Sequence, residues 1–572
     1  MQASQSLAVT LNGRGPVTLN QTNYVTTGGE ASIYRVGDTI VKIYTDPKKM
    51  VKDRMSDKIA HLAQIKHRFI VSPIDLALDK SRNAIGYYMP FVGNTEPLSR
   101  AFTTDFRTRT KFTDNDAIDL VHNMRETVTI GHHHGCILAD ANELNWLLFR
   151  APEAEPRLVD VDSWQVGNRW PARAIMMSIY DWHTTGFTEA SDWFAWAVVT
   201  FQIFTGIHPY KGRLDGYGWN DFEKRMKDNA SVFSPNVHLN AAVRDFSCIP
   251  TGLLDWYQAT FQHGERTLPP SPRDTKRVAT AARTLRQTVT TSATLVFEKI
   301  MDGGNNPFIR VYPSGLAMRQ DGRLTELRTK RAFGDIGAFT PDAEVIQTNS
   351  GWLVGEKNLF VHITLTDTMP LTTTMAISRL VRSGNRMFAV TDRGLSELML
   401  HDMGAKPLIT FSRTWPIMPN ATEWFEGLGV QNSLGAKYLI LPCDADKVNF
   451  VRVRELDNVT VVNAKAGPRF ASVVALDDTG NYKKIEFTFD EKYQKYTIWT
   501  GDTDTADLNL AILPNGVCAT IVEDTKLTIF VPASKADRKV KDKTISTDMR
   551  LATWQDKVIY IKGGDIWWVH LK

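Results

Sequence analysis

The chain has 572 residues, 43% hydrophobic and 23% charged, so it is long enough for several domains with ordinary cores. Its formal net charge of +4 is too small to make nucleic acid or an anionic membrane an expected partner. The cysteines are far apart and include no CxxC pair; they are Cys136, Cys248, Cys443 and Cys518. A disulfide framework or a structural zinc site is therefore not expected, and a reducing compartment fits best.

The sequence predicts neither a signal peptide nor a transmembrane helix. The N-terminus has no basic region followed by an apolar run. The nearest candidate for a membrane span, residues 193–204, is too short and contains Gln202. We therefore expect a cytoplasmic protein without a membrane partner.

Residues from about 15 to 95 alternate short β-type runs with turns. Residues 39–44 (TIVKIY) alternate and are rich in β-branched side chains, and residues 84–91 (AIGYYMPF) form a second predicted strand. Between them, residues 48–64 have the three- and four-residue apolar spacing of a helix.

Residues from about 115 to 290 are predicted to be mainly helical, apart from a strand–loop–strand segment that carries the motifs described below. Residues 188–204 begin with Thr and Ser, which suit a helix cap, and then become apolar nearly all round. This pattern is typical of a buried helix. Residues 273–291 are basic and rich in Ala and Thr, and we expect a connecting helix or linker there.

From about residue 292 the sequence changes to short strands separated by Gly, Asn and Asp turns. Units of strand, polar turn and strand recur roughly every 30 to 55 residues, a spacing close to the blade length of β-propellers. We expect six or seven blades, and a pair of β-sandwiches or a β-solenoid is the alternative. The aromatic residues of these units are expected to pack in the core or to form a binding platform; they include Trp352, Trp567 and Trp568.

The most informative motif lies in residues 134–148 (HGCILADANELNWLL), where Asn145 follows Asp140 by five residues. Asp160 follows shortly after, in the run RLVDVDS. An Asp, an Asn five residues later and an Asp after a strand form the working set of a protein-kinase catalytic loop and metal site. One carboxylate orients the substrate hydroxyl, while the Asn amide oxygen and the second carboxylate hold Mg²⁺ on the ATP phosphates.

Residues 20–270 resemble the protein-kinase superfamily, especially the divergent bacterial and phage kinase-like proteins. The resemblance depends on five landmarks in the expected order. Besides the Asp140 loop, these are a glycine-bearing segment (27–36), a lysine in an apolar strand, the helix after it, and the Ser-Asp-Trp start of the buried helix, with Asp192. The location implied is the cytosol of a bacterium or of a phage-infected host.

The resemblance implies a role for each candidate site residue. The predicted catalytic residues are Asp140, which orients the nucleophile, and Lys42, which contacts the phosphates. The predicted ATP-binding residues are Gly28, Gly29, Lys42 and Met89. The predicted Mg²⁺ ligands are Asn145, Asp160 and Asp162, because two carboxylates two residues apart on an extended chain point to the same side.

The sequence departs from the family pattern in several places. A third glycine is absent from the segment 27–36. The glutamate expected to pair with Lys42 falls near Lys58, so either Asp57 substitutes for it or the ion pair is missing. Leu-Ala precedes Asp140 in place of His-Arg, and no Ala-Pro-Glu equivalent is recognisable between residues 167 and 188.

Together these features predict a multidomain α+β protein, with a bilobal protein-kinase-like fold followed by an all-β domain, a six- or seven-bladed β-propeller. The expected parts are an N-terminal extension, two lobes, a linker and the propeller, at 1–18, 19–92, 93–272, 273–291 and 292–572.

The expected function is transfer of the γ-phosphoryl group of ATP to Ser or Thr hydroxyls, with Mg²⁺ as cofactor and the propeller recruiting a protein substrate or partner. One alternative is a pseudokinase scaffold that binds nucleotide without phosphoryl transfer, which the missing glutamate favours. The other is an atypical transferase that moves AMP, because one fold can support several chemistries.

Overall fold

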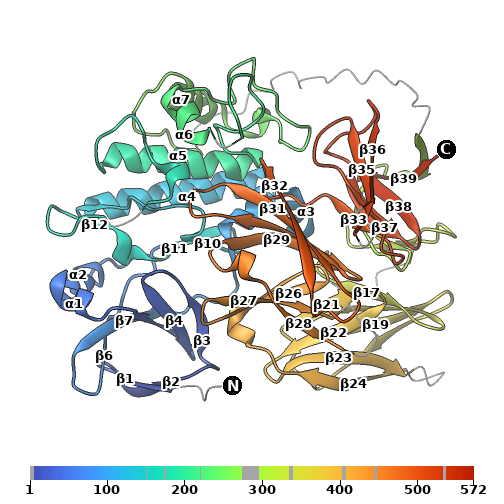
Figure 1. Ribbon diagram of the computed structural model, residues 1–572, viewed down its shortest axis with the longest axis horizontal. Helices are drawn as coiled ribbons and strands as arrows, with labels where there is room; N and C mark the ends of the chain where they lie inside the picture. Colours follow the sequence, from blue (N-terminus) through green and yellow to red (C-terminus); the bar gives the residue numbers. More distant parts are fainter. Residues whose placement is uncertain are drawn as a thin grey trace.

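The computed structural model of the chain describes most of its length (Figure 1), at residues 6–150, 153–172, 175–219, 221–273, 295–333, 339–401, 407–442, 447–532 and 536–572. Strands account for 40% of the structure and helices for 18%. The described residues form ten separate sheets and seven α-helices. Apart from Arg273, the predicted linker at 273–291 lies outside the described residues.

A seven-stranded antiparallel sheet, curved into half a barrel, forms the N-terminal part. Its order is β2-β1-β6-β7-β5-β4-β3, and the strands are β1 (Leu7–Leu11), β2 (Gly15–Leu19), β3 (Tyr24–Thr27), β4 (Ala31–Val36), β5 (Thr39–Tyr44), β6 (Asp75–Leu78) and β7 (Ala84–Pro90). Strand β5, which carries Lys42, is buried at all six positions between β4 and β7. The helix predicted at 48–64 is divided into α1 (Lys48–Lys52) and α2 (Met55–Leu62) by Arg54, whose φ is 51°.

Two long helices, α4 (Asp114–His133) and α5 (Glu189–Thr205), pack against each other in the middle of the molecule (Figure 1). Helix α5 begins with a capping box between Thr188 and Ser191 and is buried from Ser191 to Thr205. The buried helix predicted at 188–204 is therefore confirmed. The other helices are short: α3 (Thr104–Thr110), α6 (Phe222–Lys227) and α7 (Thr251–Gln262). Among the described helices, none combines the length and the apolar character that crossing a bilayer requires.

Two small sheets frame the loop that carries Asp140. One contains β8 (Thr95–Pro97), β10 (Trp146–Phe149) and β11 (Glu155–Leu158). The other pairs β9 (Cys136–Ile137) with β12 (Gln165–Val166). The loop leaves β9 and enters β10, so both of its ends are fixed by strand pairing.

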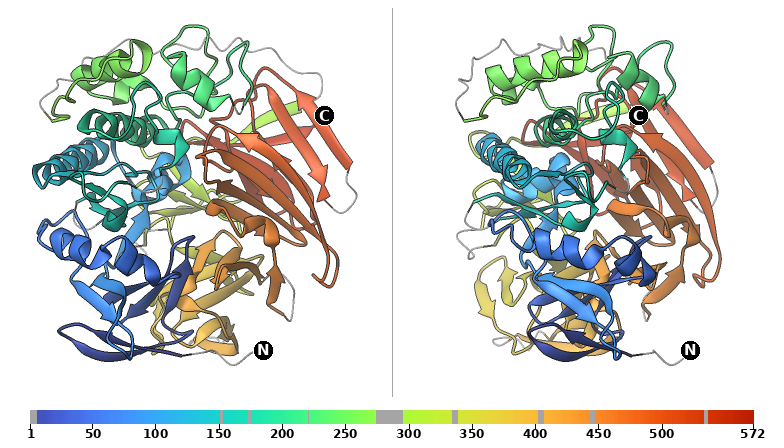
Figure 2. Two further views of the ribbon diagram at one scale, coloured as in Figure 1. Left: turned by 60° about the vertical axis from the view of Figure 1, so that its left-hand side comes forward. Right: turned by 90° about the vertical axis from the view of Figure 1, so that its left-hand side faces the viewer.

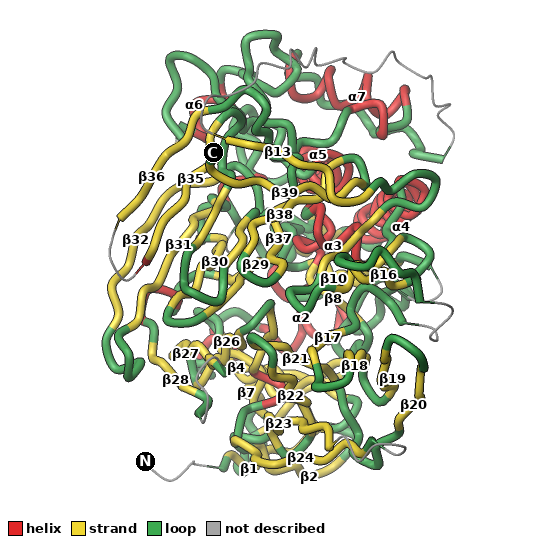
Figure 3. Tube along the Cα trace, turned by 90° about the vertical axis from the view of Figure 1, so that its right-hand side faces the viewer, coloured by secondary structure: helices red, strands yellow, loops and turns green. Residues whose placement is uncertain are grey.

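The C-terminal part consists of seven antiparallel sheets of three or four strands. The first strand, β13 (Leu295–Met301), pairs with the last, β39 (Asp565–Leu571), so the two ends of this part share one sheet (Figure 3). Strands β37 (Arg550–Trp554) and β38 (Lys557–Lys562) complete that sheet.

The other six sheets are each built from consecutive strands. They are β14 (Phe308–Val311), β15 (Leu316–Arg319) and β16 (Leu324–Glu326); β17 (Glu344–Gln347), β18 (Gly351–Glu356), β19 (Leu359–Thr364) and β20 (Thr368–Leu371); β21 (Arg379–Ser383), β22 (Arg386–Thr391), β23 (Gly394–His401) and β24 (Leu408–Trp415); β25 (Thr422–Phe425), β26 (Leu428–Ser433), β27 (Ala436–Leu441) and β28 (Asn449–Arg452); β29 (Thr460–Gly467), β30 (Phe470–Leu476), β31 (Tyr482–Phe489) and β32 (Tyr496–Thr503); and β33 (Leu510–Ile512), β34 (Cys518–Thr520), β35 (Lys526–Val531) and β36 (Ala536–Lys541).

The N-terminal and C-terminal parts pack side by side, and Figure 2 shows the half-barrel sheet beside the middle of the C-terminal part. Residues of β29–β31 belong to the same hydrophobic cluster as α4 and α5; they are Val462, Val474, Leu476 and Tyr482. The turn between β30 and β31 also reaches the helical region, where Lys211 Nζ donates to Asn481 Oδ1 at 2.5 Å. The two parts therefore share one core.

The predicted fold class, a bilobal kinase-like α+β fold followed by a β-propeller, is wrong. The protein is mostly β, with many small separate sheets and one half-barrel sheet, and its seven described helices do not form a helical lobe. The largest difference lies in residues 206–250, which were expected to be mainly helical. There Gly206, Gly212 and Gly216 all adopt positive φ, and between them and α7 the only α-helix of the described chain is the six-residue α6.

Candidate functional site

The centre of the candidate site is Lys42, whose ammonium group contacts two carboxylates. Its Nζ is hydrogen-bonded to Asp160 Oδ1 and lies 2.8 Å from Asp162 Oδ1. The Lys42 side chain is only 9% exposed. Burial alone would lower the pKa of Lys42, but attraction to Asp162 and Asp160 outweighs burial and raises it above the ordinary lysine value. The lysine therefore stays charged inside the protein.

Asp162 is the buried partner of Lys42, and both of its carboxylate oxygens are occupied. Oδ1 accepts hydrogen bonds from Lys42 and from the Tyr87 hydroxyl at 2.7 Å, and Oδ2 accepts one from the Tyr44 hydroxyl at 2.5 Å. Burial would raise the pKa of Asp162, but the charge of Lys42 and these hydrogen bonds hold it well below its usual range. Asp162 is therefore not among the proposed metal ligands, because both of its carboxylate oxygens already accept hydrogen bonds within the protein.

The helix position expected to supply a glutamate carries the opposite charge. Lys58 is buried in α2, and its Nζ donates to the backbone oxygen of Asp162 at 2.7 Å. Asp57 does not substitute for the glutamate, because its carboxylate contacts Arg54 and Arg169 near the surface. Asp162 is thus the ion-pair partner of Lys42, although the resemblance to protein kinases implied a metal-binding role for it.

Asp160 forms the open end of the cluster. Its side chain is 39% exposed, compared with 5% for Asp162. Its backbone is left-handed, with φ 61° and ψ 34°, and a short 3₁₀ turn, Val161–Ser163, follows. The two carboxylates converge on Lys42 because of this turn and not because the chain is extended. Burial and the neighbouring charge of Asp162 raise the pKa of Asp160.

Hydrogen bonds bring Asp140, Asn145 and Asp160 to one place. The Asn145 side-chain nitrogen donates to the Asp140 backbone oxygen at 2.6 Å. The backbone of Val159, next to Asp160, donates to the Asn145 backbone oxygen at 2.9 Å. These contacts place the three residues close together; that they form a functional site stays a prediction.

The Asp140 carboxylate has the properties of a proton acceptor. Its Oδ1 accepts hydrogen bonds from the backbone of Met176 and from the Asn142 side chain, both at 2.9 Å. Burial raises the pKa of Asp140 to about 6, although these hydrogen bonds oppose the shift. A carboxylate with this pKa is ionised at neutral pH and is more basic than an exposed aspartate.

Asp192, at the start of α5, anchors the Asp140 loop. Its two carboxylate oxygens accept hydrogen bonds from the backbone nitrogens of Leu138 and Ala139 at 2.7 and 2.8 Å. His132 contacts the same carboxylate at 2.9 Å. Asp192 thereby links the loop to the most buried helix of the protein.

The predicted ATP-binding residues lie on the half-barrel sheet around Lys42. Gly28 and Gly29 form the turn between β3 and β4, where Gly28 N donates to Ala31 O at 3.0 Å. A Cβ at either glycine would meet open space, so sterics alone do not require glycine there. Met89 lies in β7 opposite Ile40 and is buried in the apolar cluster that includes Tyr87 and Val159.

Asn145 and Asp160 suit Mg²⁺ only if a bound ligand supplies further oxygen atoms to the metal ion. No group of three or more His, Cys, Asp or Glu residues in the described part of the chain could hold a metal ion. The Asn145 amide nitrogen donates to the protein, which leaves its carbonyl oxygen as an acceptor beside Asp160. Mg²⁺ is commonly bound by one or two protein ligands together with substrate phosphates and water. Asn145 and Asp160 suit that mode.

Two further residues of the site were not found from the sequence. Asp181 is fully buried and forms two hydrogen bonds with Arg266, at 2.6 and 2.8 Å, which fix the segment that contains Met176. Glu143, in the Asp140 loop, is buried, and burial raises its pKa to about 7. Asp181 has no local sequence signal because its partner is distant in the chain, and Glu143 has none because its burial depends on tertiary packing.

No protein-family model and no curated protein matches the chain.

Proposed function

We propose that the protein is an ATP- and Mg²⁺-dependent phosphotransferase that transfers the γ-phosphoryl group to a Ser or Thr hydroxyl. The observation that supports this proposal most strongly is the difference between three neighbouring carboxylates. Asp162 is saturated and structural, Asp160 is open beside Lys42, and Asp140 has a raised pKa.

Each group matches one requirement of phosphoryl transfer. Catalysis of this reaction consists mainly of positioning and of neutralising charge on the phosphates. Lys42 keeps its positive charge, so it can bind a phosphate oxygen in place of Asp160. Asp160 and Asn145 would then hold Mg²⁺, which supplies charge neutralisation when bound. Asp140 would orient the acceptor hydroxyl and accept its proton.

The test is transfer of label from γ-labelled ATP to casein and to the chain itself, with Mg²⁺ present. The native protein is compared with Asp140→Asn and Asp160→Asn, and the control is Asp57→Asn, a surface aspartate on α2. We expect transfer by the native and control proteins and a loss of about a hundredfold or more in the two site variants. A parallel assay with α-labelled ATP detects AMP transfer. Absence of γ-label transfer by the folded native protein would contradict the proposal.

A second candidate is a scaffold that binds nucleotide without transferring phosphate. It is favoured by the closed arrangement of Lys42, whose ammonium is already held by two carboxylates. This candidate predicts a nucleotide-dependent rise in melting temperature that is lost in Lys42→Ala, without any label transfer. Recruitment of a protein partner by the C-terminal part stays a prediction.

A further inference from the structure

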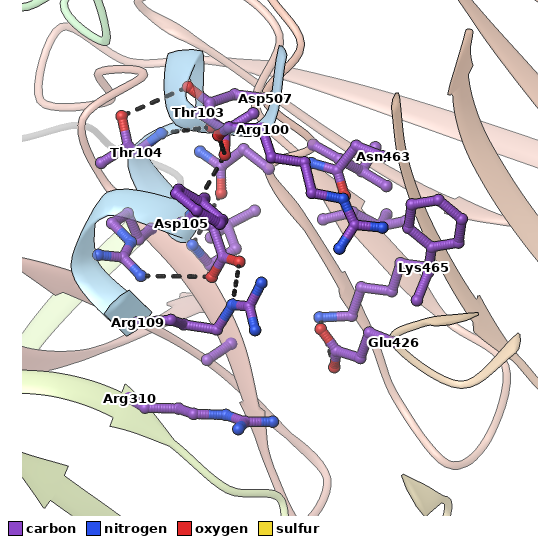
Figure 4. A pocket seen from close by; sticks show the side chains of 18 of the residues that line it. Arg100, Thr103, Thr104, Asp105, Arg109, Arg310, Glu426, Asn463, Lys465 and Asp507 are labelled. Atoms are coloured by element: carbon purple, nitrogen blue, oxygen red, sulfur yellow. Dashed lines mark hydrogen bonds and ion pairs between the residues drawn. The ribbon is translucent and has the colours of Figure 1, made fainter. Parts of the chain in front are cut away.

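A large cavity lies away from the Lys42 site, at the junction of the N-terminal and C-terminal parts (Figure 4). Its volume is about 2400 Å³. One strand of each of the seven sheets contributes to its wall; these strands are β14, β17, β21, β25, β29, β33 and β37. Helix α3 and the segment 232–247 complete the lining. The cavity exceeds the usual 300 to 1,000 Å³ of a small-molecule pocket, so a small ligand would leave room for water beside it.

Helix α3 is fixed to the C-terminal part by several polar contacts at the cavity. Thr104 N donates to Asp507 Oδ1 at 3.0 Å, and Arg550 donates to Thr108 Oγ1 at 2.7 Å. Arg109 forms an ion pair with Asp342. Because these contacts join the two parts, the cavity wall is pre-formed.

Most charges on the wall are neutralised within the protein. Glu344 lies between Arg310 and Arg382, at 3.1 and 3.3 Å. Glu426 lies between Arg382 and Lys465, at 3.5 and 3.0 Å. These positive and negative side chains alternate from one sheet to the next, and their pairing leaves little unpaired charge on this part of the wall.

Arg379, at the start of β21, differs from these residues. No hydrogen bond or ion pair joins its guanidinium to any described residue. Burial lowers the pKa of Arg379, and repulsion from Arg100 and Arg109 lowers it further, while Glu96 and Asp342 oppose this only in part. Arginine stays protonated under these conditions, so Arg379 presents a charged guanidinium to the cavity without an acceptor among the described residues.

A second guanidinium with spare donors lies in the same wall. Arg150 donates to the backbone oxygen of Thr110 at 2.9 Å and lies over the Phe106 ring, but forms no ion pair among the described residues. Burial lowers the pKa of Arg150; attraction to Asp342 and Glu96 opposes this shift in part, and repulsion from Arg109 adds to it. Arg379 and Arg150 thus share a neighbour, Arg109, and neither forms an ion pair with the carboxylates that pair with Arg109.

We propose that this cavity is a binding site for a small molecule that carries phosphate or carboxylate groups, with Arg379 as the principal contact and Arg150 as a second. The planar guanidinium matches both anions through paired N–H donors. An anion at this position would supply the missing acceptors and would relieve the repulsion among the neighbouring arginines. The inference does not depend on phosphoryl transfer at the Lys42 site.

The test is isothermal titration of the 572-residue chain with inorganic tripolyphosphate and, separately, with citrate, at constant ionic strength. The two probes distinguish phosphate from carboxylate recognition. The variants are Arg379→Gln and Arg379→Lys, and the control is Arg393→Gln, an exposed arginine in the β22–β23 turn of the same sheet, outside the cavity lining. Far-ultraviolet circular dichroism and melting temperature establish that each variant is folded.

We expect saturable binding of at least one probe by the native and Arg393→Gln proteins. The dissociation constant should rise at least tenfold in Arg379→Gln and by a smaller factor in Arg379→Lys, which keeps the charge but not the paired donors. If Arg379→Gln misfolds, the Arg379→Lys comparison serves alone. Absence of binding by the native protein, or equal binding by all variants, would overturn the proposal.

Discussion

Lys42 and Asp162 form a buried ion pair, with 2.8 Å between Nζ and Oδ1, that joins the centre of the half-barrel sheet to the turn after β11. The pair is completed by hydroxyl groups on β5 and β7, so three elements meet at one carboxylate. Asp160 contacts the same lysine but stays open on one side. This difference separates the structural role of Asp162 from the proposed ligand-binding role of Asp160.

Asp162→Asn should destabilise the protein strongly. Removing one member of a buried ion pair leaves an uncompensated charge and typically costs about 3–5 kcal/mol. Asp160→Asn should cost clearly less, because its side chain is 39% exposed and Asp162 still neutralises Lys42. Urea unfolding of both variants measures the difference. Equal losses of stability would show that Asp162 is not the principal partner of the lysine.

Phosphoryl transfer should depend on pH through Asp140. Burial raises the pKa of this carboxyl to about 6. Asp140 is therefore ionised above pH 6, and the rate should fall as the pH drops below that value and the proton acceptor is lost. The pH profile of kcat/KM, measured with saturating Mg²⁺, checks this expectation. A profile that is flat between pH 5 and 7 would argue against Asp140 as the proton acceptor.

The stability of the fold should depend on pH through Glu143. Burial raises the pKa of this carboxyl from 4.5 to about 7, so the folded state binds the proton more tightly than the unfolded state does. The stabilisation is fully present below pH 4.5 and is lost as the pH rises through 7. At about 1.4 kcal/mol per pKa unit, the loss is roughly 3 kcal/mol.

Glu143→Gln should remove this contribution. We expect the free energy of unfolding of the variant, measured in urea at pH 5 and pH 8, to change less with pH than that of the native protein. Asp140 titrates in both proteins, so the comparison isolates Glu143. The same pH dependence in both proteins would contradict this assignment.

The β30–β31 turn should be sensitive to side-chain size. A Cβ at Gly480 would lie 2.2 Å from Ser178 Oγ and 2.3 Å from its Cβ, in the segment that also positions Asp140. Gly516 has the same φ of 83°, but a Cβ there would meet nothing within 4 Å. Gly480→Ala should therefore lower the unfolding free energy by roughly 1–3 kcal/mol more than Gly516→Ala does. Equal effects would mean that the contact with Ser178 is not tight.

Local patterns in the sequence predicted several elements correctly. The strands predicted at 39–44 and 84–91 correspond to β5 (Thr39–Tyr44) and β7 (Ala84–Pro90). The helix predicted at 188–204 corresponds to α5 (Glu189–Thr205). These segments have strong periodicity or a clear cap, which a single sequence shows directly. The prediction failed at 206–250, where glycines with positive φ interrupt the chain.

The candidate site was predictable only where its residues are close in sequence. Asp140, Asn145 and Asp160 lie within one short stretch, and hydrogen bonds do bring them together. For Lys42 the sequence left open whether Asp57 is its partner or the ion pair is missing. It did not indicate Asp162, because that contact depends on how a turn 120 residues away packs on β5. The cavity around Arg379 gave no sequence signal, since each sheet contributes only a few residues to its wall.

The most direct test of the proposed function is the initial rate of γ-phosphoryl transfer by the native protein and by Asp140→Asn, with Asp57→Asn as the control. The proposed mechanism predicts measurable transfer by the native protein, an unchanged rate in the control and a loss of about a hundredfold or more in Asp140→Asn. Equal rates in all three proteins, or no transfer by a native protein that remains folded, would contradict it.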